Sequence, residues 1–184
     1  LRTSIDEDLV ISPGLFFINA CKSYANRPAL GIPNSKLISN ESIPKYILSS
    51  PFVQALGYSF TESNSYLWIN YSQVYELSCR VAKILLSLPG ITSTSKIGIC
   101  GYNTIEWAIC DFACSLIGCV SIGLHTTNSD ELCQSVIETA KISCIICTAD
   151  RMKSIQQNEF DISFNAENVL PKCSSVKHLL IMDK

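Results

Sequence analysis

Residues 96–124 read KIGICGYNTIEWAICDFACSLIGCVSIGL, and this stretch decides the fold class. It opens with an apolar run at 96–101, which predicts a strand that is buried on both faces. Asn103 and Glu106 then have the spacing of a helix capping box. Apolar residues follow at helical spacing: Ile105, Ala108, Ile109, Phe112, Ala113, Leu116 and Ile117. A second apolar run at 119–124 completes a strand–helix–strand unit.

The same alternation continues toward the C-terminus. Asn128 and Glu131 predict a further capping box, and the helix after it has an apolar inner face formed by Leu132, Cys133, Val136, Ile137 and Ala140. Residues 142–148 and 176–182 predict two more strands. Strands that alternate with helices form parallel units with right-handed crossovers. We therefore expect an α/β fold in which a parallel sheet is flanked by helices on both faces.

The N-terminal half is less regular. A helix is predicted over 13–26, and strands are predicted at 29–32 and 66–71. Asn70 and Gln73 then form a capping box for a helix that Pro89-Gly90 ends. Residues 33–65 contain three prolines among many serines and asparagines, and we interpret them as a surface insertion. The whole chain, 1–184, is expected to be one domain whose regular βαβ region is 96–184.

Charge and hydropathy exclude two classes of protein. The 14 Lys+Arg and 16 Asp+Glu residues give a net charge of −2, which argues against a nucleic-acid binder with a broad basic surface. The apolar window at 105–124 contains Glu106, Asp111 and Gly118, so it predicts a buried helix and strand rather than a membrane span. Apolar residues make up 47% of the chain, more than one small domain buries. Because the chain also begins at Leu1, we expect it to be processed or cut out of a longer protein.

The ten cysteines are interpreted as free, buried thiols of a reducing, cytosolic compartment. Most lie in apolar runs: Cys100, Cys110, Cys114, Cys119, Cys133, Cys144 and Cys147. The single C-x-x-C, Cys144 to Cys147, falls in a predicted strand, where side chains three apart point to opposite faces. A redox motif of this type opens a helix instead. The two histidines lack metal-binding spacing to the cysteines, so we predict no zinc site.

The best-placed polar cluster is His125 with Thr126 and Thr127, directly after the strand at 119–124. Ligands of open α/β sheets gather at the carboxyl ends of strands, so this cluster is a candidate binding site. The other interpretation is a strand-to-helix turn that hydroxyls and the Asn128 cap close. Both interpretations stay open, and no catalytic, cofactor-binding or metal-ligating residue is assigned.

Other motifs support only structural interpretations. The chain contains no G-x-x-x-x-G-K-[ST], G-x-G-x-x-G, G-x-S-x-G or H-E-x-x-H pattern. Gly98 and Gly101 indicate a close approach of the backbone. Trp107 is interpreted as a packing residue and His178 as a solvated one.

Three stretches resemble the opening third of AMP-forming acyl-CoA synthetases: WINYSQVY at 68–75, IGICGYNTIEW at 97–107 and IGLHTTNSDELCQ at 122–134. Asn103, Glu106 and Trp107 are similar to the N-x-x-E-W of long-chain fatty acyl members, and the wider pattern looks most like the bubblegum branch. RPALG at 27–31 resembles another early segment of the family. The resemblance covers about residues 10–184 apart from the insertion. Ile105 stands where many members have proline, and the family's Ser/Thr/Gly-rich phosphate loop has no counterpart here.

The resemblance implies that the chain is the N-terminal part of an AMP-binding ligase domain. The implied parent enzyme converts a long-chain fatty acid, ATP and coenzyme A to acyl-CoA, AMP and diphosphate through an acyl-adenylate, with Mg²⁺. The chain alone is expected to be an inactive scaffold that holds no cofactor and self-associates through the helix at 104–117. The implied location is cytoplasmic or peripheral on intracellular membranes. Two alternatives stay open: a flavodoxin-like nucleotide-binding or regulatory module, and a cysteine-based redox or interaction domain.

Overall fold

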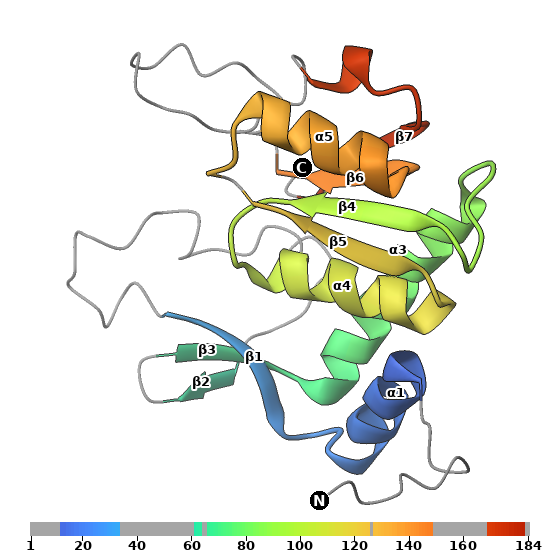
Figure 1. The fold of residues 1–184 in the computed structure, drawn as a ribbon. Coiled ribbons are helices and arrows are strands. Elements are labelled where there is room, and N and C mark those ends of the chain that lie inside the picture. The colour runs from blue at the N-terminus through green and yellow to red at the C-terminus, as the bar shows by residue number, and fades with distance from the viewer. Residues whose placement is uncertain (1–11, 34–60, 64–65, 126, 149–168, 183–184) are drawn as a thin grey trace, which may run out of the picture.

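The computed structural model describes residues 12–33, 61–63, 66–125, 127–148 and 169–182 (Figure 1). Most of the predicted insertion at 33–65 therefore lies outside the described residues. Thr126 of the predicted polar cluster lies outside them as well.

The central element is a four-stranded parallel sheet, as predicted. Its strands lie in the order β5 (Val120–Leu124), β4 (Lys96–Cys100), β6 (Cys144–Cys147) and β7 (His178–Ile181). Gly98 in β4 lies opposite Ile122 on one side and Ile145 on the other. Strand β6 begins later than predicted because the amide of Ile142 still donates to Ile137 in the preceding helix.

Helices cover both faces of this sheet, which confirms the predicted layers. Figure 1 shows α5 (Asp130–Ala140) on one side, and α4 (Ile105–Ile117) with α3 (Tyr71–Ser87) on the other. Successive residues of β6 alternate between two hydrophobic cores: Cys144 and Ile146 pack with α3 and α4, whereas Ile145 and Cys147 pack with α5 and the short 3₁₀ helix η4 (Leu170–Lys172). This alternation is the period of two that a strand imposes.

The N-terminal elements form a smaller antiparallel sheet and one more helix. The helix α1 (Pro13–Ser23) starts at Pro13 as predicted, and the sheet has the order β1 (Pro28–Pro33), β3 (Tyr66–Asn70), β2 (Thr61–Ser63). The predicted insertion was wrong at its two ends, because Pro33 belongs to β1 and Thr61–Ser63 pairs with β3. The short sequence Thr-Glu-Ser has no apolar alternation, so only its pairing with β3 makes it a strand.

One of the three predicted capping boxes is confirmed. Asn70 Oδ1 accepts from the Gln73 amide at 2.8 Å, and Gln73 Oε1 accepts from the Asn70 amide at 2.8 Å. The other two were wrong by one residue. Thr104 caps α4 by accepting from the Trp107 amide at 3.3 Å, and Ser129 caps α5 by accepting from the Leu132 amide at 3.3 Å. Several neighbouring polar residues can each serve as an N-cap, and the backbone path decides which one does.

Two expectations about α4 were also wrong. Glu106 does not complete an Asn103 cap, because Thr104 is the cap residue; Glu106 is 5% exposed and lines a small hollow with Cys110, Ile146 and Met182. Nor is α4 the uncovered helix, because α1 and α3 pack against it. Large exposed apolar side chains among the described residues lie on other elements, for example Phe16 on α1 and Val120 on β5.

Helix α1 approaches α4 at a glycine. A Cβ placed on Gly14 would overlap the backbone carbonyl of Ser115. The two helices can therefore contact each other closely only because Gly14 has no side chain. Phe17, one turn along α1, stacks on Phe112 of α4 with ring centroids 4.3 Å apart.

We predict that Gly14→Ala lowers the free energy of unfolding by about 1–3 kcal/mol, because the added methyl pushes α1 away from α4. Urea titration measures the loss. Asn19→Ala, on the exposed side of α1, is the matched control and should leave stability within about 0.5 kcal/mol of wild type. Equal stability of Gly14→Ala and wild type would contradict the close helix contact.

The position of the α4 cap gives a second prediction. Thr104→Ala removes the side-chain acceptor for the Trp107 amide and should cost about 1 kcal/mol. Asn103→Ala should cost less, because Asn103 is not the cap residue. Thermal unfolding of the two variants side by side measures the difference. A larger loss for Asn103→Ala would show that the helix begins one residue earlier.

Candidate functional site

The predicted polar cluster lies at the carboxyl edge of the parallel sheet. His125 follows β5, and the neighbouring strand β4 ends at Cys100. Between the two strand ends is a hollow of about 200 Å³, lined by His125, Tyr102, Asn103, Trp107 and Gly123 among others. His125 therefore lies at the carboxyl edge of the sheet, as predicted, and its role as a binding residue stays a prediction.

Hydrogen bonds within the turn orient the His125 ring. Its Nδ1 lies 2.8 Å from Thr127 Oγ1 and accepts from the Thr127 amide at 3.4 Å. The Asn128 amide donates to the His125 carbonyl at 3.1 Å. These contacts support the turn interpretation.

The residues around the hollow suit binding rather than proton transfer. Among the described residues, no carboxylate lines it that would form an acid–base pair with His125. Trp107 and Tyr102 contribute aromatic surface, and Asn103 contributes an amide. From the sequence, Asn103 is predicted to be a cap and Trp107 a packing residue. Asn103 lies in the loop that follows β4 and Trp107 in the first turn of α4, and this place after a parallel strand was the signal for the same edge as His125.

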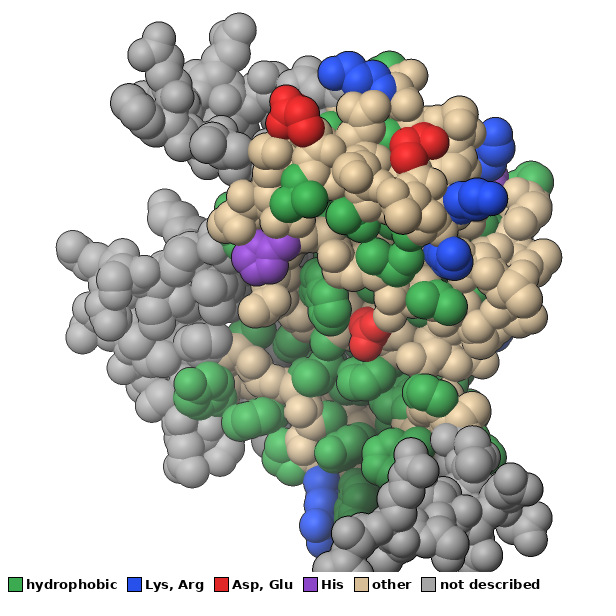
Figure 2. Space-filling model, viewed as in Figure 1, with side chains coloured by type: hydrophobic (Ala, Val, Ile, Leu, Met, Phe, Trp, Pro, Cys, Tyr) green, Lys and Arg blue, Asp and Glu red, His purple; other side chains and the backbone are tan. Residues whose placement is uncertain are grey.

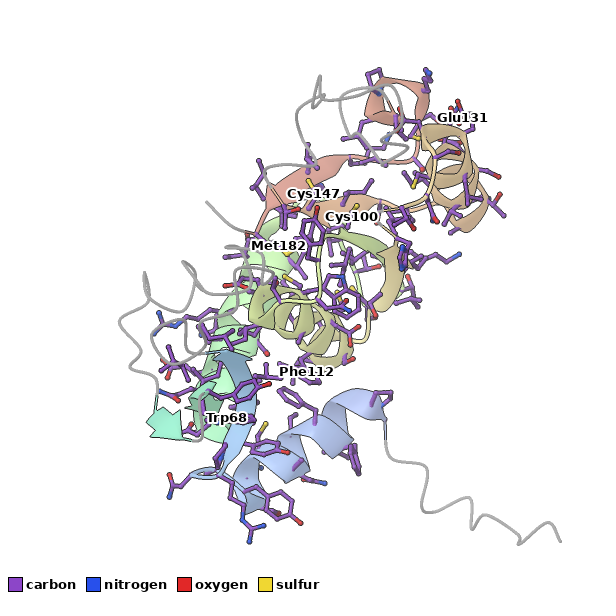
Figure 3. The ribbon with its side chains drawn as sticks, turned by 90° about the vertical axis from the view of Figure 1, so that its left-hand side faces the viewer. Trp68, Cys100, Phe112, Glu131, Cys147 and Met182 are labelled. Atoms are coloured by element: carbon purple, nitrogen blue, oxygen red, sulfur yellow. The ribbon has the colours of Figure 1, made fainter. Side chains whose placement is uncertain are left out.

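A second feature of this edge lies between β4 and β6. Gly101 follows β4, and a Cβ on it would be 3.0 Å from both Thr148 Cγ2 and Met182 Cε. Figure 3 shows Cys100, Cys147 and Met182 gathered where their strands end. The predicted close approach at Gly98 is confirmed as well, since a Cβ there would be 3.1 Å from Leu124. Both glycines are thus packing residues of the sheet.

His178 does not behave as a purely solvated residue, contrary to the prediction. Its Nε2 donates to the carbonyl oxygen of Pro89 at 2.8 Å. This bond ties the start of β7 to the turn that ends α3. His178 is therefore a structural link far from the carboxyl edge, since it lies at the opposite end of its strand.

The cysteines are buried, as predicted. Nine of the ten are buried and Cys79 is half-buried. Cys144 and Cys147 belong to different cores on opposite faces of β6, so the C-x-x-C does not form a paired redox site. Burial is the main cause that raises the pKa of Cys110 and Cys144 to about 12, and that of Cys21 and Cys133 to about 11. Within the described ranges, no group of three or more histidine, cysteine or acidic side chains is arranged to hold a metal ion.

We predict that native protein at pH 7.5 reacts rapidly with a thiol reagent at Cys79 only, and that denaturant releases the other nine thiols. The other nine thiols are buried, and burial raises the pKa of several of them, such as Cys110 and Cys133, so little of the reactive thiolate form is present at this pH. The absorbance of the chromophore that the reagent releases counts the thiols that have reacted. Cys79→Ser is the control and should remove the fast phase. Three or more fast thiols at pH 7.5 would contradict this arrangement.

No helix among the described residues is long and apolar enough to span a membrane.

Comparison with known proteins identifies the family. The family model described as AMP-binding enzyme matches residues 52–184. The long-chain-fatty-acid–CoA ligase ACSBG2 of Mus musculus is 36% identical over 83 residues, which are 45% of this chain and 12% of that protein. The Homo sapiens protein of the same name is 32% identical over 116 residues, 63% of this chain and 16% of that protein. This chain thus matches less than a fifth of the length of either relative.

Solved structures share the fold. The A-PCP didomain of a carboxylic acid reductase from Segniliparus rugosus, in complex with AMP, superposes with a TM-score of 0.68 at 17% identity, covering 95% of this chain and 21% of that one. A long-chain-fatty-acid-CoA ligase from Archaeoglobus fulgidus gives a TM-score of 0.60 at 14% identity. The match covers 93% of this chain and 27% of that one. The matched family model spans most of the chain and the architecture agrees with these structures, so the chain belongs to the AMP-binding enzyme family.

Proposed function

We propose that this chain is the part of a long-chain fatty acid–CoA ligase that builds the first parallel sheet of its AMP-binding domain. One observation carries the proposal. Two of the three stretches that resemble such ligases, 97–107 and 122–134, contain β4 with the start of α4 and most of β5 with the start of α5, and their loops converge on one hollow at the carboxyl edge. The curated relatives that match these residues are named long-chain-fatty-acid–CoA ligases.

The proposed reaction of the whole enzyme joins a fatty acid to coenzyme A. Fatty acid, ATP and coenzyme A give acyl-CoA, AMP and diphosphate, with Mg²⁺ as the metal. The described residues do not fit the nucleotide phosphates or Mg²⁺ at the hollow, because no lysine, arginine or carboxylate lines it there. The sequence also contains no glycine-rich phosphate loop. We therefore assign these residues no step of the chemistry and propose that they act as scaffold.

As a scaffold, these residues fix the positions of two loops at the carboxyl edge of the sheet. Strands β4 and β5 end side by side, and each is followed by a capped helix that begins at the same edge. The caps at Thr104 and Ser129 fix where each loop turns. Loops held in this way position groups from other parts of an enzyme without contributing reactive side chains themselves.

A cellular location and an association state belong to the proposal. Ten free thiols suit a reducing compartment, either the cytoplasm or the surface of an intracellular membrane. Within the described residues, β5 is an edge strand on which Val120 is 50% exposed. Such an edge favours self-association of the isolated chain.

The test has two arms. The 184-residue chain alone should form no acyl-CoA from a radiolabelled long-chain fatty acid, ATP and coenzyme A, because it lacks the phosphate loop. A chimera in which this chain replaces the matching segment of the human relative should retain fatty acid–CoA ligation. The matched control chimera carries Leu85→Asp, which places a charge in the core and should abolish folding and activity together.

The outcomes separate the parts of the proposal. Acyl-CoA formation by the chain alone would overturn the scaffold role. A folded chimera that forms acyl-CoA at less than a hundredth of the human rate would overturn the assignment as a ligase segment. Equilibrium dialysis measures whether the isolated chain binds AMP. Such binding would favour a nucleotide-binding module instead.

A further inference from the structure

A second hollow lies away from the carboxyl edge, where α1, β1, α3 and α4 meet. Its volume is about 400 Å³, within the range of small-molecule sites. Four aromatic side chains line it: Phe16, Phe17, Tyr71 and Phe112. Figure 2 shows apolar side chains gathered over α1 and α4, with an acidic side chain among them.

The acid in this apolar wall is Asp111. It lies on α4, accepts a hydrogen bond from the Ser121 hydroxyl, and lines the hollow beside Ser115. A carboxylate has about four acceptor sites, so the bond from Ser121 leaves others for a ligand. Among the described residues, no lysine or arginine lines the hollow, so its one formal charge is negative.

The aromatic rings and the carboxylate select the same kind of ligand. Phe17 and Phe112 stack on each other and form an apolar wall, whereas the exposed ring of Phe16 has a π face that attracts cations such as organic ammonium groups. A carboxylate within the same wall adds an opposite charge and repels a fatty carboxylate. Phe16, which is 68% exposed, lies at the mouth and offers its ring to an entering molecule.

We propose that the hollow between α1, β1, α3 and α4 is a binding site for a small organic ammonium that carries an apolar tail. The tail packs against Phe17, Leu30 and Phe112, and the ammonium lies by Asp111. The site is separate from the hollow at His125, with which it shares no lining residue. The proposal does not depend on the chain being part of a ligase, since the occupant is neither nucleotide nor fatty acid.

The test measures the binding of three probes with six-carbon chains to the 184-residue chain by isothermal titration calorimetry: hexyltrimethylammonium, hexanol and hexanoate. Hexyltrimethylammonium should bind about tenfold more tightly than either of the others. Asp111→Asn keeps an acceptor for the Ser121 hydroxyl but removes the charge, so this preference should fall to less than threefold. Glu131→Gln, an exposed charge on α5, is the matched control and should preserve the preference.

A second variant tests the position. Ala20→Phe fills the hollow and should abolish binding of the ammonium probe; Ala20→Leu serves the same purpose if the larger ring prevents folding. Equal affinities for the three probes, or an unchanged preference in Asp111→Asn, would overturn the proposal. Tighter binding of hexanoate would overturn it as well and would indicate a site for an acyl chain.

Discussion

The packing of α4 against the sheet is the contact on which the rest of the structure depends. Ile109, Ala113 and Cys114 of this helix have no measurable exposure, and they pack against β4 and β6 on one side and α3 on the other. Small side chains at 113 and 114 let three layers approach one another. Without this helix, the crossover from β4 to β5 would bury no apolar face. The two strands would then have nothing to hold them side by side in the parallel sheet.

The same packing explains why the chain uses so many cysteines. Cys110, Cys114, Cys119 and Cys144 lie near one another between α4 and the sheet, and each has a raised pKa to which burial contributes most. A neutral thiol is a small, polarisable hydrophobe, so it fills gaps that serine would leave with an unpaired hydroxyl. The density of cysteine is therefore a property of the core and not of a redox site.

Two regions of the surface stand apart from this core. The carboxyl edge carries polar and aromatic side chains that come from consecutive βα loops, and its geometry follows directly from the parallel sheet. The α1 face depends on longer-range contacts, since Phe17, Tyr71 and Asp111 come from elements that are far apart in the sequence. The fold class alone implies the first region but says nothing about the second.

The sequence by itself determined the elements whose periodicity is strong. The period of apolar residues across 96–148 predicted every strand and helix there, the parallel direction of the strands and the two covered faces, because burial on both sides imposes near-continuous apolar runs. It also placed His125 at the carboxyl edge, and the resemblance in 97–107 and 122–134 indicated the family that the comparison confirmed.

Only the tertiary structure decided features that depend on which neighbours meet. Thr61–Ser63 becomes a strand through its pairing with β3, and Thr104 and Ser129 displace Asn103 and Asn128 as caps because the backbone path brings their oxygens to the right amides. Glu106 becomes buried through the approach of α3 and β6. Asp111 meets the aromatic rings because Gly14 lets α1 lie against α4. Local sequence encodes propensity and period, whereas contacts between distant segments depend on distances that only the folded chain sets.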